Sequence, residues 1–315
     1  MSVFTPLSHD DIREFLRQFD LGELRHSEGI KGGSENTNYF VDCDSGRYVL
    51  TLVERGPVQD LPFFIQLLDC LKSAGLPVPF AFRNRKGQAL LTLKNKPALL
   101  QPRLPGHHPE QVNEHQCAEL GTLLAKLHSA SCGLQRRSDR GPEWVLQQAD
   151  AFLGTVWQAE HTWLAPCLAK LNSELIEKAP DLPQAVIHGD LFRDNAMFEH
   201  GTISGIIDFY NAATGWTLLE LAICVNDWCV DVTASGLQLN HARTQALLAS
   251  YTQQRALTES EQRVWPQMLQ LAALRFWLSR QQYAELHRDQ PGVLIKDPLY
   301  FRELLQLHYQ QARGD

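Results

Sequence analysis

The chain has 315 residues, 44% of them hydrophobic, and this length suits two domains of roughly 100 to 200 residues each. Its formal net charge is −7 and its sequence pI is about 5.9, and no run of lysine or arginine is long enough to follow a phosphate backbone. These properties argue against a nucleic-acid partner, so we expect a small-molecule partner. No stretch approaches the ~20 apolar residues of a membrane span.

Seven cysteines are scattered through apolar segments, and none forms a Cys/His cluster with zinc spacing. We therefore expect reduced thiols inside the protein. Residues 1–11 lack a basic and apolar targeting signal, which favours a cytoplasmic location. Nothing in the sequence indicates the oligomeric state.

The N-terminal third predicts a helix followed by a β hairpin. Ser8 and Asp11 have the spacing of a capping box, and apolar residues then repeat at helical intervals up to Phe19. A glycine-rich stretch over residues 29–39 precedes two β-like runs within residues 39–53, which an Asp-Ser-Gly turn separates. This order indicates a strand pair preceded by a glycine-rich loop.

Two further elements complete this part of the chain. Apolar residues at helical spacing predict a helix over residues 60–74, which a glycine and two prolines would end. Residues 90–101 indicate a closing hairpin, followed by a linker rich in proline. We therefore predict an N-terminal domain of residues 1–101, an antiparallel sheet with helices, and a mainly helical domain of residues 102–315.

The polar residues that packing explains least lie in residues 186–208. Asn195 lies five positions after Asp190, as in the catalytic loop of kinases, where the Asp meets the substrate hydroxyl and the Asn holds Mg²⁺. Asp208 ends a short β-like run, where kinases place a second metal-binding carboxylate. Taken singly, each piece also fits an ordinary turn or strand cap. The combination favours a kinase, because Mg²⁺ prefers carboxylate and amide oxygens.

This segment resembles the Brenner-type motif of aminoglycoside-phosphotransferase-like kinases, a small-molecule branch related to protein kinases. Other stretches resemble the homoserine kinases of that fold, from the first residues to the last thirty. These stretches are Gly29-Ile30-Lys31-Gly32-Gly33-Ser34-Glu35-Asn36-Thr37-Asn38-Tyr39, Tyr48-Val49-Leu50-Thr51-Leu52, Leu61-Pro62-Phe63-Phe64, Leu221-Ala222-Ile223-Cys224, Leu274-Arg275-Phe276-Trp277-Leu278-Ser279-Arg280 and Lys296-Asp297-Pro298. The resemblance implies a two-lobed, protein-kinase-like fold of the α+β class.

The resemblance also implies an ATP-dependent enzyme that phosphorylates the side-chain hydroxyl of L-homoserine. Asp190 would be the catalytic residue that orients this hydroxyl, and Asn195 and Asp208 would bind Mg²⁺. The product would be O-phospho-L-homoserine, an intermediate towards threonine.

In kinases a glycine-rich loop covers the ATP phosphates, because glycine lets backbone N–H groups approach them closely. By resemblance, Gly32 and Gly33 would contact the phosphates, although such loops also occur as ordinary turns. Ser34, Asn36, Thr37 and Asn38 would add side-chain donors. Adenine would bind along the hinge between the domains, where the expected residues are Leu99, Leu100 and Gln101.

One position departs from the wider kinase pattern. The third strand of a kinase carries a lysine that contacts the α- and β-phosphates, and here that position holds Thr51. The helix over residues 60–74 should supply the glutamate partner of the lysine, yet it contains no glutamate. Their joint absence is consistent, because either one buried alone would be costly. Lys31, Arg55 and Mg²⁺ are left as candidates to neutralise the phosphates.

An amino-acid acceptor needs a cation for its carboxylate and an anion or carbonyl groups for its ammonium. Arg275 and Arg280, which lie in an apolar run, are candidates for the first, and Asn226 and Asp227 for the second. Either arginine could instead bridge helices in a structural ion pair with Asp227, Asp231 or Glu220. The sequence leaves both interpretations open.

Two other functions remain open. The same kinase fold could act on an aminoglycoside, choline, ethanolamine or methylthioribose. A nucleotide-binding pseudokinase that regulates a partner is the alternative from another class, and the missing lysine is its one support. The retained Asp190, Asn195 and Asp208 argue against it.

Overall fold

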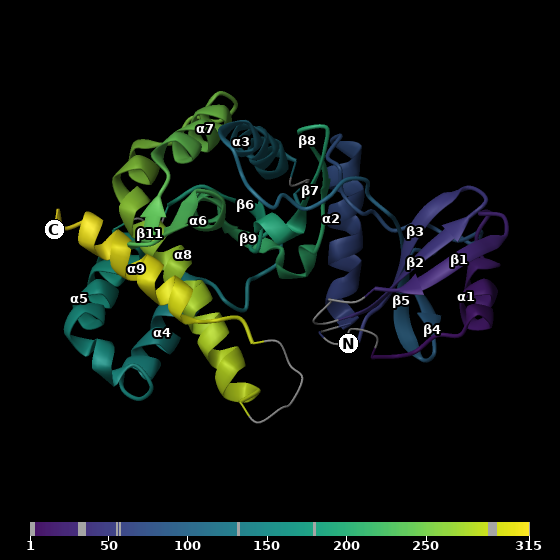
Figure 1. Ribbon diagram of the computed structural model, residues 1–315, viewed down its shortest axis with the longest axis horizontal. Coiled ribbons are helices and arrows are strands. Elements are labelled where there is room, and N and C mark those ends of the chain that lie inside the picture. The colour runs from purple at the N-terminus through teal and green to yellow at the C-terminus, as the bar shows by residue number, and fades with distance from the viewer. Residues whose placement is uncertain are drawn as a thin grey trace. The chain divides into compact units, whose positions relative to one another are not determined.

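The computed structural model describes residues 4–30, 36–54, 56, 58–130, 133–178, 181–288 and 295–314. The chain forms two compact units (Figure 1). The first consists of Met1–His107, Ala130–Leu134 and Ala196–Asp208, and the second of His108–Ser129, Gln135–Asn195 and Phe209–Asp315. The first unit therefore extends past the expected boundary at Gln101 and includes a segment from the second half of the chain.

A five-stranded antiparallel sheet forms the body of the first unit (Figure 1). Its strands are β1 (Leu24–Gly29), β2 (Thr37–Cys43), β3 (Gly46–Leu52), β4 (Leu91–Leu93) and β5 (Lys96–Pro102). The order is β1-β2-β3-β5-β4, so β3 has partners on both edges. This register places Thr51 opposite Asn38 on one side and opposite Leu99 on the other.

Two helices accompany this sheet. The helix α1 (His9–Leu16) begins at the predicted capping box, and its Ile12 and Phe15 belong to the same apolar core as the buried residues of β2 and β3. The helix α2 (Leu61–Ser73) follows the 3₁₀ turn η1 (Val58–Asp60), in agreement with the helix predicted over residues 60–74.

The first unit also contains the hairpin of β7 (Ala196–Glu199) and β8 (Thr202–Ile206). The backbone of Phe198 forms two hydrogen bonds with His107, at 3.0 and 2.9 Å. At the end of β8, the N–H of Ile206 donates to the carbonyl of Pro77 at 2.9 Å. These backbone contacts fix the hairpin from both strands.

The expectation of reduced thiols is wrong at Cys70 of α2, which is disulfide-bonded. Its Sγ lies 2.7 Å from the carbonyl oxygen of Ala130, although 60 residues separate the two positions. This long-range approach could not be predicted from the sequence. The described cysteines Cys43, Cys117, Cys167, Cys224 and Cys229 are free and buried, as expected.

The second unit is mainly helical, as predicted. Its helices α6 (Thr217–Trp228) and α8 (Glu259–Leu286) pack against each other, and each contains a buried tryptophan, Trp228 in α6 and Trp277 in α8. Among the residues that the structure describes, no helix is both long and apolar enough to cross a membrane. The remaining elements are α3 (Glu114–Ser129), α4 (Pro142–Leu153), η2 (Gln158–Glu160), α5 (His161–Leu171), the π-helix η3 (Asn172–Glu177), β6 (Gln184–Ile187), η4 (Arg193–Asn195), η5 (Phe209–Asn211), β9 (Ala213–Trp216), β10 (Val230–Thr233), β11 (Gly236–Leu239), α7 (His241–Thr252) and α9 (Leu299–Gln311).

Candidate active site

The loop over residues 188–195, which follows β6, contains a tight turn at Gly189. Its φ is +76°, in the left-handed region that favours glycine. A Cβ atom at this position would lie only 3.1 Å from the carbonyl oxygen of Asn211. The turn therefore requires a glycine immediately before Asp190.

Glu220 of α6 holds the N–H side of this turn. It is fully buried, and its carboxylate accepts hydrogen bonds from the N–H of His188 and, at 3.1 and 3.2 Å, from the N–H of Gly189. Burial raises the pKa of Glu220 to about 7, while the two N–H donors and the positive charge of Arg275 act to lower it. The carboxyl group of Glu220 thus ties the turn to the buried helix α6.

Carbonyl groups of the loop also accept hydrogen bonds from side chains of α6 and α8. Arg275 Nη1 donates to the carbonyl of Gly189 at 2.6 Å. The carbonyl of Leu191 accepts from Trp228 Nε1 at 3.0 Å and from the Cys224 thiol at 3.6 Å. Backbone on both sides of Asp190 is consequently fixed by buried side chains.

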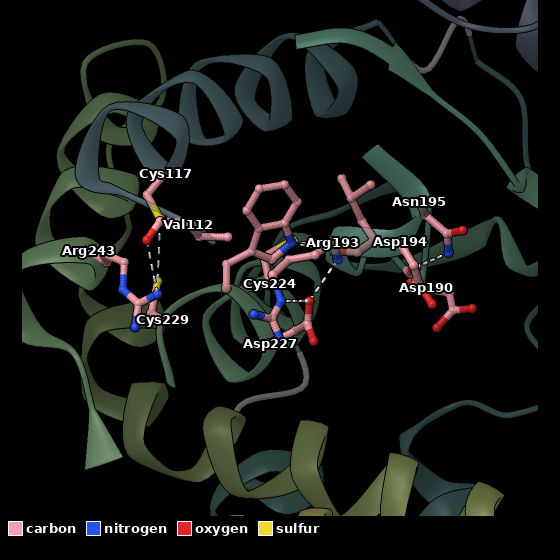
Figure 2. Close-up of polar contacts among 12 residues, drawn as sticks. Val112, Cys117, Asp190, Arg193, Asp194, Asn195, Cys224, Asp227, Cys229 and Arg243 are labelled. Atoms are coloured by element: carbon pink, nitrogen blue, oxygen red, sulfur yellow. Dashed lines mark hydrogen bonds and ion pairs between the residues drawn. The ribbon is translucent and has the colours of Figure 1, made fainter. Parts of the chain in front are cut away.

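Asp190 and Asn195 lie side by side, as Figure 2 shows. Asn195 ends η4, is only 9% exposed, and donates from Nδ2 to the carbonyl of Asp190 at 2.8 Å. Its Oδ1 is then the remaining polar atom, an oxygen of the kind that hard cations bind. Asp190 Oδ2 lies 3.5 Å from Asn211 Nδ2. The structure therefore brings together two of the three residues that the spacing singled out.

Asp208, the third of these residues, follows β8 and ends the first unit. Its φ of +64° is left-handed, which aspartate adopts more readily than most residues with a side chain. Such a conformation costs about 1–3 kcal/mol and persists only where the surroundings fix it. The carboxylate of Asp208 and the amide oxygen of Asn195 are each a kind of ligand that Mg²⁺ takes in proteins.

Three of the predicted nucleotide-binding residues form a hydrogen-bonded row across the sheet of the first unit. Thr51 is 4% exposed, and its Oγ1 donates to Asn38 Oδ1 at 2.7 Å and lies 3.5 Å from Gln101 Oε1. Gln101 Nε2 in turn donates to the carbonyl of Pro79 at 2.6 Å. Neutral groups thus occupy the strand position where protein kinases carry a charged lysine.

Of the other residues predicted to bind the nucleotide, the structure describes Leu99, Leu100 and Asn36. Leu99 and Leu100 are buried, and the carbonyl of Leu100 accepts from the N–H of Phe82 at 2.7 Å. Asn36 is 8% exposed, and its Oδ1 accepts from the N–H of Glu54 at 3.1 Å. The others, Gly32, Gly33 and Ser34, lie outside the described residues, as do the candidate cations Lys31 and Arg55.

Replacing Thr51 with valine keeps the shape of the side chain and removes its hydroxyl. We expect the free energy of unfolding to fall by about 1 to 2 kcal/mol, because Asn38 Oδ1 loses its donor. Denaturant unfolding measures this change. Thr202, whose exposed hydroxyl donates to the carbonyl of Glu199, is the matched control, and Thr202→Val should stay within about 0.5 kcal/mol of wild type. Equal losses in the two variants would contradict the role given to the row.

The four candidate substrate residues differ in their surroundings. Asn226 is 1% exposed and uses both polar atoms in the core, since Nδ2 donates to the carbonyl of Leu269 at 2.9 Å and Oδ1 accepts from His308 Nε2 at 2.8 Å. Asp227 accepts from the backbone N–H and from Nε of Arg193, at 2.7 and 3.3 Å (Figure 2). Burial raises the pKa of Asp227, and the positive charge of Arg193 acts to lower it.

The two arginines of α8 occupy different places. Arg275 is 8% exposed and donates to Gly189, whereas Arg280 is partly buried and donates to the carbonyl of Asp297 at 2.9 Å. Burial lowers the pKa of Arg280, and Tyr300, when it is ionised, and the negative charge of Asp227 oppose this effect. Of the described residues, neither arginine has an ion-pair partner, so the structural ion pair anticipated as an alternative is not observed for either.

Sequence reasoning missed several polar residues around this loop. Besides Arg193 and Asn211, these are Lys296 and Asp194, whose charged groups lie 3.2 Å apart. Asn211 and Lys296 are 21 and 102 residues from their partners in the loop, so no local spacing could reveal these contacts. Arg193 lies inside the loop itself, so its position next to Asp194 is the feature of the sequence that could have indicated a role at the site.

The chain is similar to one protein family, to homoserine kinases and to solved structures of phosphotransferases. The model of the phosphotransferase enzyme family matches residues 26–257. Homoserine kinase of Pseudomonas aeruginosa is 52% identical over 303 residues, covering 96% of this chain and 94% of its own length, and that of Methylobacillus flagellatus is 40% identical over 310 residues, covering 97% and 95%.

Solved structures agree on the fold at low sequence identity. A spectinomycin phosphotransferase in complex with ADP and spectinomycin has a TM-score of 0.69 at 13% identity, covering 98% of this chain and 100% of its own. An amicoumacin kinase in complex with AMP-PNP and Ca²⁺ has a TM-score of 0.70 at 14% identity, covering 97% and 94%. The predicted kinase-like fold of the α+β class is confirmed.

Proposed function

The chain belongs to the phosphotransferase enzyme family and is an ATP-dependent kinase of L-homoserine, and we propose that Asp190, Asn195 and Asp208 carry out its chemistry. The observation that carries this function is the 52% identity to a homoserine kinase across 96% of the chain. The product is O-phospho-L-homoserine, an intermediate of threonine biosynthesis. We also place the protein in the cytoplasm, where ATP is available.

When bound, ATP supplies the γ-phosphoryl group, and Mg²⁺ neutralises the charge that develops on it. Asp190 accepts a hydrogen bond from the substrate hydroxyl, directs its oxygen in line towards the γ-phosphorus, and takes the proton as the new O–P bond forms and the bond to ADP breaks. Asn195, through Oδ1, and Asp208, through its carboxylate, are the proposed metal ligands. Positioning and charge neutralisation supply most of the rate.

The nucleotide is proposed to bind through the predicted residues of the first unit. The row of Asn38, Thr51 and Gln101 supports this assignment, because it aligns polar groups on three adjacent strands. These groups are neutral, so they can position the nucleotide but add no positive charge. The positive charge that faces the phosphates would have to come from Mg²⁺ or from another cation, for which Lys31 and Arg55 stay candidates. The remaining members of the set are Gly32, Gly33, Ser34, Asn36, Leu99 and Leu100.

Arg280 and Asp227 are the proposed partners of the homoserine carboxylate and ammonium. Both are charged, and each lies close enough to influence the pKa of a common neighbour, Tyr300. Arg280 has guanidinium nitrogens besides the one that donates to Asp297. Asn226 is less suited to the ammonium, because its polar atoms already bond to Leu269 and His308.

Replacing Arg280 with methionine should remove the preference for a substrate carboxylate. We expect kcat/KM for L-homoserine to fall about a hundredfold, while that for 3-aminopropan-1-ol, which lacks the carboxylate, changes by less than about threefold. Steady-state kinetics with both alcohols measures the ratio. Arg302, which pairs with Glu160 at 2.7 Å, provides the control, and Arg302→Met should keep the ratio of wild type. A parallel loss on both alcohols in Arg280→Met would reject the assignment.

The function itself is tested by ADP release from MgATP. L-homoserine, L-serine, choline and an aminoglycoside are offered in separate reactions, and release is expected with L-homoserine. Release with another alcohol alone would reassign the acceptor. Nucleotide binding without release in any reaction would favour a pseudokinase.

A further inference from the structure

We propose that Arg275 is a positioning residue that holds the Gly189–Asp190 peptide in its reactive orientation, and that it does not bind the substrate carboxylate. This inference rests on the proposed kinase function. It concerns a side chain on α8 that lies 86 residues from the loop that it contacts.

The contact lies at the peptide group that carries Asp190. Arg275 Nη1 donates to the carbonyl of Gly189 at 2.6 Å, and a Cβ atom on Gly189 would lie 3.7 Å from Nη2. The guanidinium therefore lies against the glycine itself. Because a peptide group is planar, fixing this carbonyl also fixes the N–H of Asp190 and the place of its Cα atom, from which the side chain extends.

Two opposite charges hold this turn from its two polar sides. The carboxylate of Glu220 meets the N–H groups of His188 and Gly189, and the guanidinium of Arg275 meets the carbonyl of Gly189. Each charge thus meets the end of the peptide dipole that it attracts. The left-handed turn at Gly189 is therefore held by charge-assisted hydrogen bonds, which are the stronger kind.

The electrostatic surroundings of Arg275 support the same role. Burial acts to lower its pKa, and the negative charges of Asp190 and Glu220 act to keep it charged, with Arg140 opposing them. Arg275 therefore lies within the electrostatic reach of both Asp190 and Glu220. Arg275 is only 8% exposed, so its guanidinium has little access to a substrate.

The test compares Arg275→Met, which removes the charge, Arg275→Lys, which keeps it, and Arg275→Ala, which leaves a cavity. Arg243 provides the control. It is equally buried, donates to the carbonyl of Val112 at 3.3 Å and pairs with Asp231, and Figure 2 shows it beside Cys229, apart from Asp190. The measurements are kcat, the KM values for L-homoserine and MgATP, thermal stability, and the pH dependence of kcat.

In Arg275→Met we expect kcat to fall about a hundredfold with both KM values within about threefold of wild type, because the loop is misplaced but the binding groups remain. Arg275→Lys should lose about tenfold, and millimolar guanidinium should restore part of the kcat of Arg275→Ala. Arg243→Met should lose thermal stability and keep kcat within about threefold.

The pH profile supplies a readout that a loss of packing would not change. Glu220 must be ionised to accept both N–H groups, so kcat falls as the pH drops through its pKa. In Arg275→Met the cation that lowers this pKa is gone, so the fall should begin at a higher pH, whereas Arg275→Lys should keep the profile of wild type. The other titratable groups around the pair, Asp190, His188, Cys224 and Arg140, are the same in both variants.

The proposal is overturned if Arg275→Met keeps kcat, or if its kcat loss is matched by Arg243→Met. A KM for L-homoserine that rises about a hundredfold at unchanged kcat would instead make Arg275 a carboxylate ligand. If Arg275→Met does not fold, Arg275→Lys and the guanidinium rescue decide the question. A wild-type protein that releases no ADP with L-homoserine would show the separate failure of the kinase function.

Discussion

Replacing Asp190 with asparagine should lower kcat by about a thousandfold or more, because the hydroxyl of the acceptor loses both its orienting anion and the group that takes its proton. Asparagine has the same shape, so the hydrogen bonds around the loop should survive and the KM for MgATP should stay within a few-fold of wild type. Coupled measurement of ADP release with L-homoserine gives both constants.

The control for this prediction is Asp194 in the same loop. Its side chain is 60% exposed and pairs with Lys296 at 3.2 Å, so the pair contributes little to stability. Asp194→Asn removes the same charge four residues away and should keep kcat within about fivefold. A substantial residual turnover in Asp190→Asn, or an equal loss in the two variants, would remove Asp190 from the catalytic role.

The second large effect is expected for Asp208→Asn in its response to magnesium. Asparagine also tolerates the φ of +64° found here, so this change removes the charge and leaves the backbone undisturbed. We expect kcat to fall by about 10² to 10³ and the Mg²⁺ concentration for half-maximal rate to rise, because one of two protein ligands is weakened. Titration of Mg²⁺ at fixed ATP measures both.

Asp208→Ala distinguishes the loss of the metal ligand from the effect of the backbone conformation on stability. Alanine disfavours a positive φ, so this variant should also unfold at a lower temperature, which Asp208→Asn should not. A magnesium requirement identical to that of wild type in both variants would exclude Asp208 as a ligand.

The fold class could be predicted because the local patterns agree with the structure. The capping box of Ser8 and Asp11, the helix now bounded as Leu61–Ser73, and the strand pair in β2 and β3 each carry their own sequence signal. The pair Asp190 and Asn195 could also be found, because both residues lie in one short loop whose spacing reflects its geometry.

The sequence could not show what each charged residue contacts across the fold. An arginine in an apolar run is compatible with a substrate, an ion pair or a backbone carbonyl, and only the packing of α8 shows that Arg275 contacts Gly189. The same holds for Asn226, whose amide lies in the core beside His308. For Thr51 the sequence revealed the missing charge, whereas the neutral row with Asn38 and Gln101 depends on strand register.

Little conformational entropy remains to be lost in the catalytic loop when substrates bind, because Glu220, Arg275 and Trp228 already fix its backbone. None of these three anchors needs to change when the acceptor changes. Side chains that select the alcohol can therefore diverge without disturbing the reactive geometry. A loop ordered in this way would allow one scaffold to evolve towards phosphorylation of chemically different alcohols.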